Sequence, residues 1–170
     1  MKIIEALKKI KENKQKIGEL HQRIALNCAN QNIETPLYGE ETPDKIKEWL
    51  QSCTDISQQN VNLLCSIQKT NLQTMVTIEL GNKSVTKSIS EWVWRRREYA
   101  RIDQETWSKL GDRNLKEGSY PSSQGVPNEL KIVRHFNPSE RDEKIDVYRS
   151  EPHKIDAALE IVNAVTDLVE

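Results

Sequence analysis

The stretch from residue 3 to residue 28, "IIEALKKIKENKQKIGELHQRIALNC", decides the class of fold. Isoleucine recurs at every seventh position, at Ile3, Ile10, Ile17 and Ile24. The alternate positions of the repeat hold, in order, Leu7, Lys14, His21 and Cys28. Such a repeat predicts one amphipathic helix over residues 2–29. Because polar side chains interrupt the seam, we expect packing inside a bundle rather than a free two-stranded coiled coil.

A second long helix is predicted over residues 42–71. Thr42 offers a hydroxyl N-cap, and Pro43 suits the first helical position. Asn60 lies on the apolar stripe of this helix, whose other members are Ile46, Trp49, Leu50, Cys53, Ile56, Leu63, Leu64 and Ile67. Turn residues fill the loop at 30–42, so we expect the two helices to pair antiparallel.

The apolar period changes from helical to alternating after residue 74. "TMVTIELGNKSVT" (74–86) predicts a β-hairpin, with Gly81 and Asn82 as its two-residue turn. Thr86 is the expected cap of a third helix, which extends to about residue 116. The apolar stripe of that helix is Ile89, Trp92, Val93, Ala100, Trp107 and Leu110.

The last third of the chain begins with a flexible loop at 117–128, "EGSYPSSQGVPN". Residues 129–136 are predicted to form a strand, with 144–148 as its possible partner. A final helix is expected from Ser150, with Pro152 in its first turn. We therefore predict a single domain, 1–170. It is mainly α, a four-helix bundle-like domain with a long N-terminal helical hairpin and one or two small β-hairpins.

Composition limits the classes of function. The chain has 170 residues, 25 basic and 26 acidic, for a net charge of -1. That balance argues against general nucleic-acid binding. Without a signal-like N-terminus or a run of about 18 apolar residues, we expect a cytoplasmic protein that does not cross a membrane. The three cysteines, Cys28, Cys53 and Cys65, form no disulfide framework and are expected to be small buried side chains. The low apolar content favours a homo-oligomer.

Four stretches carry a resemblance over most of the chain: "ALKKIKENKQKIGELHQRIALNC" (6–28), "IQKTNLQT" (67–74), "VTKSISEWVWRRR" (85–97) and "IDAALEIVNAVTDL" (155–168). In combination they resemble the septicolysin-like family of small, mostly uncharacterised bacterial proteins, whereas residues 111–148 depart from its pattern. The resemblance implies a mostly helical, self-associating fold with a small β element. The cytolytic activity that the family name suggests is not carried over, because the chain has no membrane-inserting segment.

The stretch "EWVWRRREYARIDQETW" (91–107) holds the candidate site. Regular α-helical spacing places Arg96 on the apolar face with Asp103, and leaves Arg95 solvated. A buried charge needs a partner. One interpretation is a structural pairing with buried polar groups such as Asn60, Asn71 or Asn163. The other is a polar pocket between helices.

Arg97 and Arg101 are one turn apart, beside Trp94. They form either a solvated charged face or an anion site, in which guanidinium groups grip phosphate and the indole stacks on a base. Further candidate contacts are Thr70, Asn71 and Thr74, which otherwise merely end the second helix.

The sequence offers few candidate catalytic residues. His21, His135 and His153 are isolated, no metal-ligand spacing is present, and no cofactor is expected. We therefore favour a non-catalytic, self-associating protein that binds or sequesters a small anionic, phosphate-bearing or nucleotide-like ligand, as some viral anti-defence proteins do. The expected ligand-binding residues are Trp94, Arg96, Arg97, Arg101, Thr70, Asn71, Thr74 and Asp103. The alternative is a protein–protein interaction or scaffold module, followed by a metal-dependent hydrolase.

Overall fold

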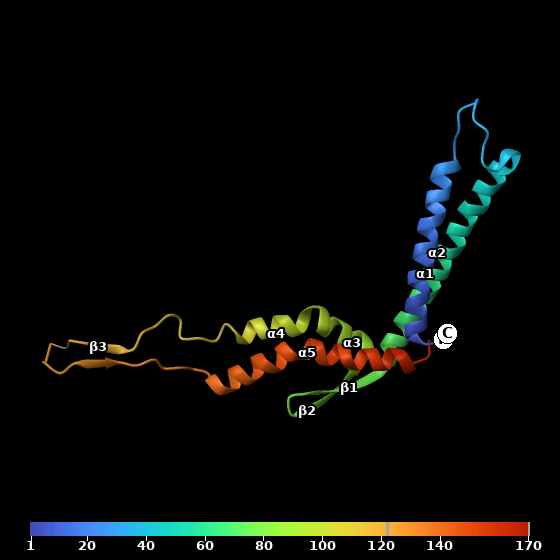
Figure 1. The fold of residues 1–170 in the computed structure, drawn as a ribbon. Helices are drawn as coiled ribbons and strands as arrows, with labels where there is room; N and C mark the ends of the chain where they lie inside the picture. The colour runs from blue at the N-terminus through green and yellow to red at the C-terminus, as the bar shows by residue number, and fades with distance from the viewer. Residues whose placement is uncertain (122, 170) are drawn as a thin grey trace. The chain divides into compact units, whose positions relative to one another are not determined.

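The computed structural model describes residues 1–121 and 123–169 (Figure 1). Contacts divide the chain into two compact units, Met1–Thr74 with the segment from Leu159 onward, and Met75–Ala158. The mainly α prediction is confirmed, with a long N-terminal helical hairpin and two small antiparallel β-hairpins in the described residues. The prediction of a single domain stays a prediction.

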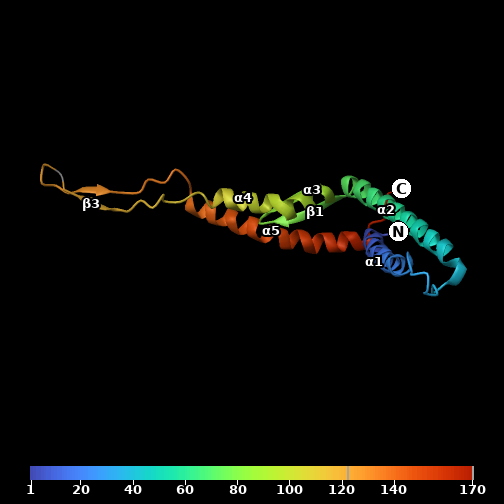
Figure 2. The same ribbon diagram turned by 90° about the horizontal axis from the view of Figure 1, so that it is seen from above.

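The first unit contains the long helical hairpin, α1 (Ile3–Asn27) and α2 (Thr42–Gln73), joined through the 3-10 turn η1 (Gly39–Glu41). The two helices pack on each other along their length (Figure 1, Figure 2). The side chains that α2 buries recur three and four residues apart: Trp49, Ile56, Asn60, Ile67 and Thr70. Leu50 and Leu64, which were predicted on this stripe, are 52% and 46% exposed.

The second row of the α1 seam differs from the prediction by one residue. Ile3 and Ile10 are buried as expected, but the alternate buried positions are Ala6, Asn13 and Leu20. The predicted positions, Leu7, Lys14, His21 and Cys28, are exposed. A heptad can place its second row three or four residues after the first. Alanine and asparagine at the correct positions carried too weak a hydrophobic signal to decide between them.

A buried amide pair lies in the middle of this seam. Asn13 Nδ2 donates to Asn60 Oδ1 over 2.8 Å. An apolar cluster of Ala6, Ile10 and Ile67 lies toward one end, and another of Leu20, Trp49 and Ile56 lies toward the other. A polar pair inside an apolar seam is satisfied in one register only. The pair therefore fixes how α1 and α2 align.

Replacing Asn60 with alanine tests this role. The Asn13 amide would lose its acceptor inside the seam, and we expect the free energy of unfolding to fall by about 1–3 kcal/mol. Urea denaturation followed by circular dichroism measures this loss. The control is the double variant Asn13→Leu/Asn60→Leu, which removes both polar groups and should recover most of the stability. An equal loss in both variants would contradict the pairing.

The C-terminal segment closes the open end of the helical hairpin. Ile3 N donates to Thr166 O over 3.0 Å, and Lys2 pairs with Asp167 at 2.5 Å. Val169 N donates to the hydroxyl of Thr70, which is fully buried. These contacts hold both chain ends at the base of the first unit.

The second unit begins with a hairpin of β1 (Met75–Leu80) and β2 (Lys83–Ser88), in which Leu80 pairs with Lys83. Gly81 forms the turn at a φ of 59°, a left-handed conformation that favours glycine. The predicted cap Thr86 lies within β2. The helix begins two residues later, because Ser88 and Glu91 form a capping box.

The third predicted helix is three elements in a row: α3 (Ile89–Trp94), the π-turn η2 (Arg95–Tyr99) and α4 (Ala100–Trp107). It therefore ends before residue 116. The side chains of Ile89, Trp92 and Ala100 are at most 2% exposed, as the stripe predicted. The indole Nε1 of Trp92 donates to the Val76 carbonyl over 2.9 Å, which fastens α3 to β1.

The prediction for the last third of the chain was wrong in two respects. Residues 144–148 are helical, because α5 runs from Pro138 to Val165 and contains Pro152 in its interior. The Asn137 side chain caps α5 by accepting from Ser139 N over 3.0 Å. The second hairpin instead pairs β3 (Gly118–Tyr120), inside the predicted loop, with β4 (Asn128–Leu130), which overlaps the predicted strand only at residues 129–130. Ser122, in the same loop, lies outside the described residues.

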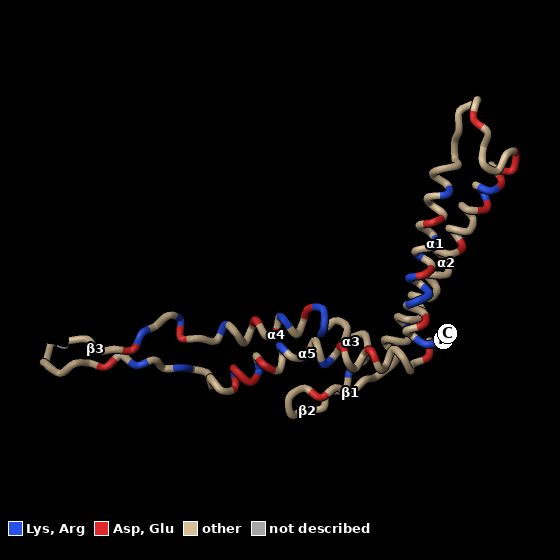
Figure 3. Tube along the Cα trace, in the orientation of Figure 1, with Lys and Arg blue, Asp and Glu red and all other residues tan. Residues whose placement is uncertain are grey.

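Positive and negative charges are mixed along the backbone of both units. Basic and acidic residues intermingle along the helices of both units (Figure 3). No helix in residues 1–121 and 123–169 is long and apolar enough to cross a membrane. The expectation that the cysteines are buried was wrong for Cys28 and Cys65, which are exposed.

Candidate functional site

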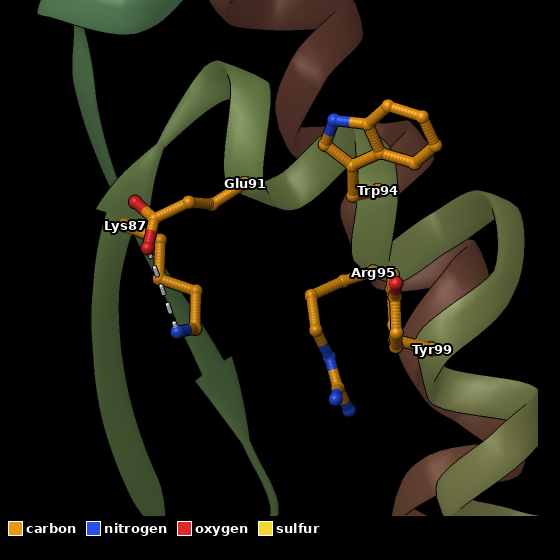
Figure 4. A pocket seen from close by; sticks show the side chains of 5 residues that line it. All are labelled: Lys87, Glu91, Trp94, Arg95 and Tyr99. Atoms are coloured by element: carbon orange, nitrogen blue, oxygen red, sulfur yellow. Dashed lines mark ion pairs between the residues drawn. The ribbon is translucent and has the colours of Figure 1, made fainter.

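A groove in the second unit is the candidate site, because it contains Trp94 of the predicted site. Its volume is about 370 Å³, and its lining comes from β2, α3 and η2: Lys87, Glu91, Trp94, Arg95 and Tyr99 (Figure 4). Lys87 and Glu91 form an ion pair at 4.0 Å. The aromatic side chains are open to solvent, Trp94 by 53% and Tyr99 by 48%. The groove therefore combines two open rings with internally paired charges.

Arg95 anchors the wall of this groove to α5. Its Nε and Nη2 each donate to one carboxylate oxygen of Glu151 over 2.7 Å, and its Nη1 donates to Asp103 over 2.5 Å. The guanidinium also lies 5.7 Å from the centre of the Tyr148 ring. Glu151 is 1% exposed, so the carboxylate of this forked pair is closed to water. The hydrogen bond with Glu151 raises the pKa of Arg95 above its ordinary value, and the guanidinium stays charged.

The π-turn explains why Arg95, and not Arg96, makes this pair. Ala100 N donates to the Arg95 carbonyl five residues back, which is the hydrogen bond of a π-turn. The wider turn absorbs one extra residue. Arg95 and Asp103, eight residues apart, therefore share a face, as residues roughly two turns apart do in a regular helix.

The prediction that Arg96 projects from the apolar face while Arg95 is solvated was therefore wrong. Arg96 is half-exposed and pairs with Asp156 of α5, whereas Arg95, predicted to be solvated, is the arginine with the buried partner. The prediction assumed unbroken α-helical spacing through residues 91–107. No residue type in "RRREY" distinguishes a π-turn from an α-helix. The local sequence therefore could not have revealed the change in helical spacing.

The other predicted residues of this helix have separate environments. Trp94 lines the groove, as the site prediction requires. Arg101 is 74% exposed and pairs with Glu105 at 3.7 Å. Arg97 is exposed and has no ion pair in the described part of the chain. Because η2 spans Arg97, it interrupts the one-turn spacing to Arg101 on which the anion grip depends.

Thr70, Asn71 and Thr74 belong to the first unit, at the end of α2. The Thr70 hydroxyl donates to Ser66 O over 2.8 Å and accepts from Val169 N. Thr74 N donates to the Thr70 carbonyl. The Asn71 Oδ1 atom is buried and has no hydrogen-bond partner among the described residues. The two threonines thus hold the helix end and the C-terminal segment in place.

Sequence reasoning missed Lys87, Tyr99 and Glu151 as functional candidates. Lys87 and Tyr99 reach the groove through the β-hairpin and the π-turn, whose geometry is not visible in spacing alone. Glu151 stands between Ser150 and Pro152, where the sequence predicts the start of a helix. Its true place inside α5 buries it.

The capping box beside the groove allows a pH test. Ser88 N and Ser88 Oγ both donate to the Glu91 carboxylate over 2.8 Å. These two hydrogen bonds, the backbone one most strongly, lower the pKa of Glu91 below its ordinary value. The ionised Glu91 carboxylate stabilises the fold fully above the ordinary carboxyl pKa, and this stabilisation is lost as the pH falls through the lowered pKa. In Ser88→Ala we expect the Glu91 pKa to rise. A carbon-13 NMR titration measures it, and an unchanged pKa would contradict the hydroxyl contact.

Clusters of potential metal ligands were sought in the described residues. No group of three or more histidine, cysteine, aspartate or glutamate side chains in residues 1–121 and 123–169 is placed to hold a metal ion.

Comparison with known proteins places the chain in a family. Residues 11–168 match the model of a family of unknown function (DUF6847). The chain belongs to this family. A second likeness concerns the fold of this DUF6847 member alone: the crystal structure of a functionally unknown conserved protein from Corynebacterium diphtheriae matches with a TM-score of 0.56 and 20% sequence identity, over 99% of each chain. A comparison with curated proteins gave no match.

Proposed function

We propose that the protein is a non-catalytic interaction module, and that the groove around Trp94 and Tyr99 docks a partner protein. One observation carries the proposal: both cations that line the groove are already paired with carboxylates, whereas both rings are about half open. Such cations offer little net charge to an anionic ligand. Exposed Trp and Tyr, in contrast, are the side chains that most often dominate binding between proteins.

The ion pairs beneath the groove support this role by holding its wall rigid. Arg95 joins η2 to Glu151 of α5 and to Asp103 of α4. The rings of Trp94, at the end of α3, and Tyr99, at the end of η2, then project from a fixed wall. A pre-organised surface loses less conformational entropy when a partner docks.

Replacing either ring tests the proposal. Tagged protein is purified from cells of the source organism after cross-linking, as wild type, Trp94→Ala and Tyr99→Ala. Tyr120→Ala is the matched control, because Tyr120 is also 48% exposed but lies on β3, outside the groove. We expect a partner that wild type and Tyr120→Ala retain and both groove variants lose. The same proteins retained by all four samples would overturn the proposal.

A small anionic, phosphate-bearing or nucleotide-like ligand is the second candidate. It is favoured by the Lys87–Glu91 distance of 4.0 Å, the longest ion-pair distance in the second unit. A phosphate could therefore recruit Lys87 while a base stacks on Trp94. Thermal shift with a panel of nucleotides tests this, since a ligand that binds the folded state raises the melting temperature. A rise that Lys87→Ala abolishes would favour the ligand over the partner protein.

A further inference from the structure

Among the exposed aliphatic side chains of the first unit, four lie on facing turns of α1 and α2, far in sequence from the groove. Ile4 and Leu7 on α1 are 46% and 44% exposed, and Val61 and Leu64 on α2 are 50% and 46% exposed. We call them the apolar quartet. Large apolar side chains that gather on a surface mark a binding site more often than single ones do.

Helix geometry places the quartet on one face of the hairpin. Ile4 and Leu7 are three residues apart, as are Val61 and Leu64, so each pair shares one side of its helix. Every member follows a seam residue by one position. In two right-handed helices that pair antiparallel, positions just after the seam turn to the same side of the pair.

The quartet occupies the half of the hairpin between the Asn13–Asn60 pair and the chain ends. The core cluster of Ala6, Ile10 and Ile67, with Leu63 packed against it, joins the same turns of α1 and α2. The C-terminal segment occupies this end on the side of Lys2, through the pair with Asp167. Lys2 lies one position before the seam, opposite the quartet. The C-terminal segment therefore covers the opposite side of the hairpin and leaves the face with the quartet open to solvent.

The charges next to the quartet are of one sign. Lys11 and Lys14 continue its row along α1, and neither has a carboxylate three or four residues away in the sequence or an ion pair in the described part of the chain. Lys9 and Lys16 occupy the opposite side of α1. Each of those two has a glutamate both three residues after and four residues before it. The quartet is therefore flanked by positive charge without a local counter-charge.

We propose that this face docks an amphipathic helix whose apolar side covers the quartet and whose acidic flank meets Lys11 and Lys14. Helices bind other helices through residues three and four apart, and opposite charges at the rim set the choice of partner. A second copy of this chain would bring its own two lysines toward the same rim, where like charges repel. A membrane surface is disfavoured because the quartet has no aromatic residue.

A synthetic helical peptide provides the probe. One fluorescein-labelled peptide carries leucines on one face with glutamates beside them, and its twin carries lysines in place of the glutamates. Fluorescence anisotropy against the full chain measures the dissociation constant. We expect the acidic peptide to bind, and binding to weaken about tenfold with Leu7→Gln/Leu64→Gln and with Lys11→Glu/Lys14→Glu.

The matched control is Lys9→Glu/Lys16→Glu, which reverses two exposed lysines of the same helix and should leave binding unchanged. Circular dichroism checks that each variant keeps its helical content. The proposal is overturned by no saturable binding of the acidic peptide, by equal binding of its lysine twin, or by equal weakening in the control.

Two other occupants of the face give distinct results. Self-association of the wild type that Leu7→Gln/Leu64→Gln abolishes, measured by sedimentation equilibrium, would assign the face to a second copy. Co-sedimentation with phosphatidylserine vesicles, lost in Lys11→Glu/Lys14→Glu, would assign it to a membrane. Either result overturns the acidic helix. Because every substitution lies outside the groove, none of these outcomes depends on the function proposed for Trp94 and Tyr99.

Discussion

An Arg95→Met variant is expected to lose about 3 kcal/mol of its free energy of unfolding, because Glu151 would remain buried as an unpaired charge. Glu151 is 1% exposed, and Arg95 supplies both hydrogen bonds to its carboxylate. The estimate takes the low end of the usual range for buried pairs, since the Arg95 side chain keeps 21% of its exposure. Urea denaturation followed by far-UV circular dichroism measures the change.

Arg96→Met is the matched control for this prediction. Arg96 is the next residue along the same turn, but it pairs with Asp156 where both side chains are about half exposed. Such surface pairs contribute about 0–1 kcal/mol, so this variant should remain close to wild type. Equal losses in the two variants, or a larger loss in Arg96→Met, would contradict the register that the π-turn gives to this helix.

The long helices could be predicted because their apolar residues repeat over many turns. The seven-residue spacing of isoleucine located α1, and the stripe from Ile46 to Ile67 located α2. The repeat did not show, however, which residues form the second buried row of α1. Ala6 and Asn13 occupy the second row of α1. Their small or polar side chains are buried only because α2 packs against that side.

The second unit was harder to predict because tertiary contacts decide its local structure. Residues 144–148 contain isoleucine, valine and tyrosine, which favour strands, yet they lie inside α5. Pro152 suggested a helix start, but the cap at Asn137 begins the helix much earlier. The candidate site inherits both errors. Its key pair joins a residue of the unforeseen π-turn to Glu151, which was predicted at the start of the final helix and lies in the interior of α5.

Trp92→Ala is the substitution with the largest expected effect on stability. Trp92 is fully buried, and its removal leaves a cavity that costs about 3–5 kcal/mol, to be measured as the loss in the free energy of unfolding. Trp92→Phe separates two causes, because it keeps most of the apolar volume but leaves the Val76 carbonyl without its indole donor. We expect it to cost about 1–3 kcal/mol. Trp107→Ala, a partly exposed tryptophan on α4, should cost less than either. A Trp107 variant as unstable as Trp92→Ala would place the core of this unit further along the helix than α3.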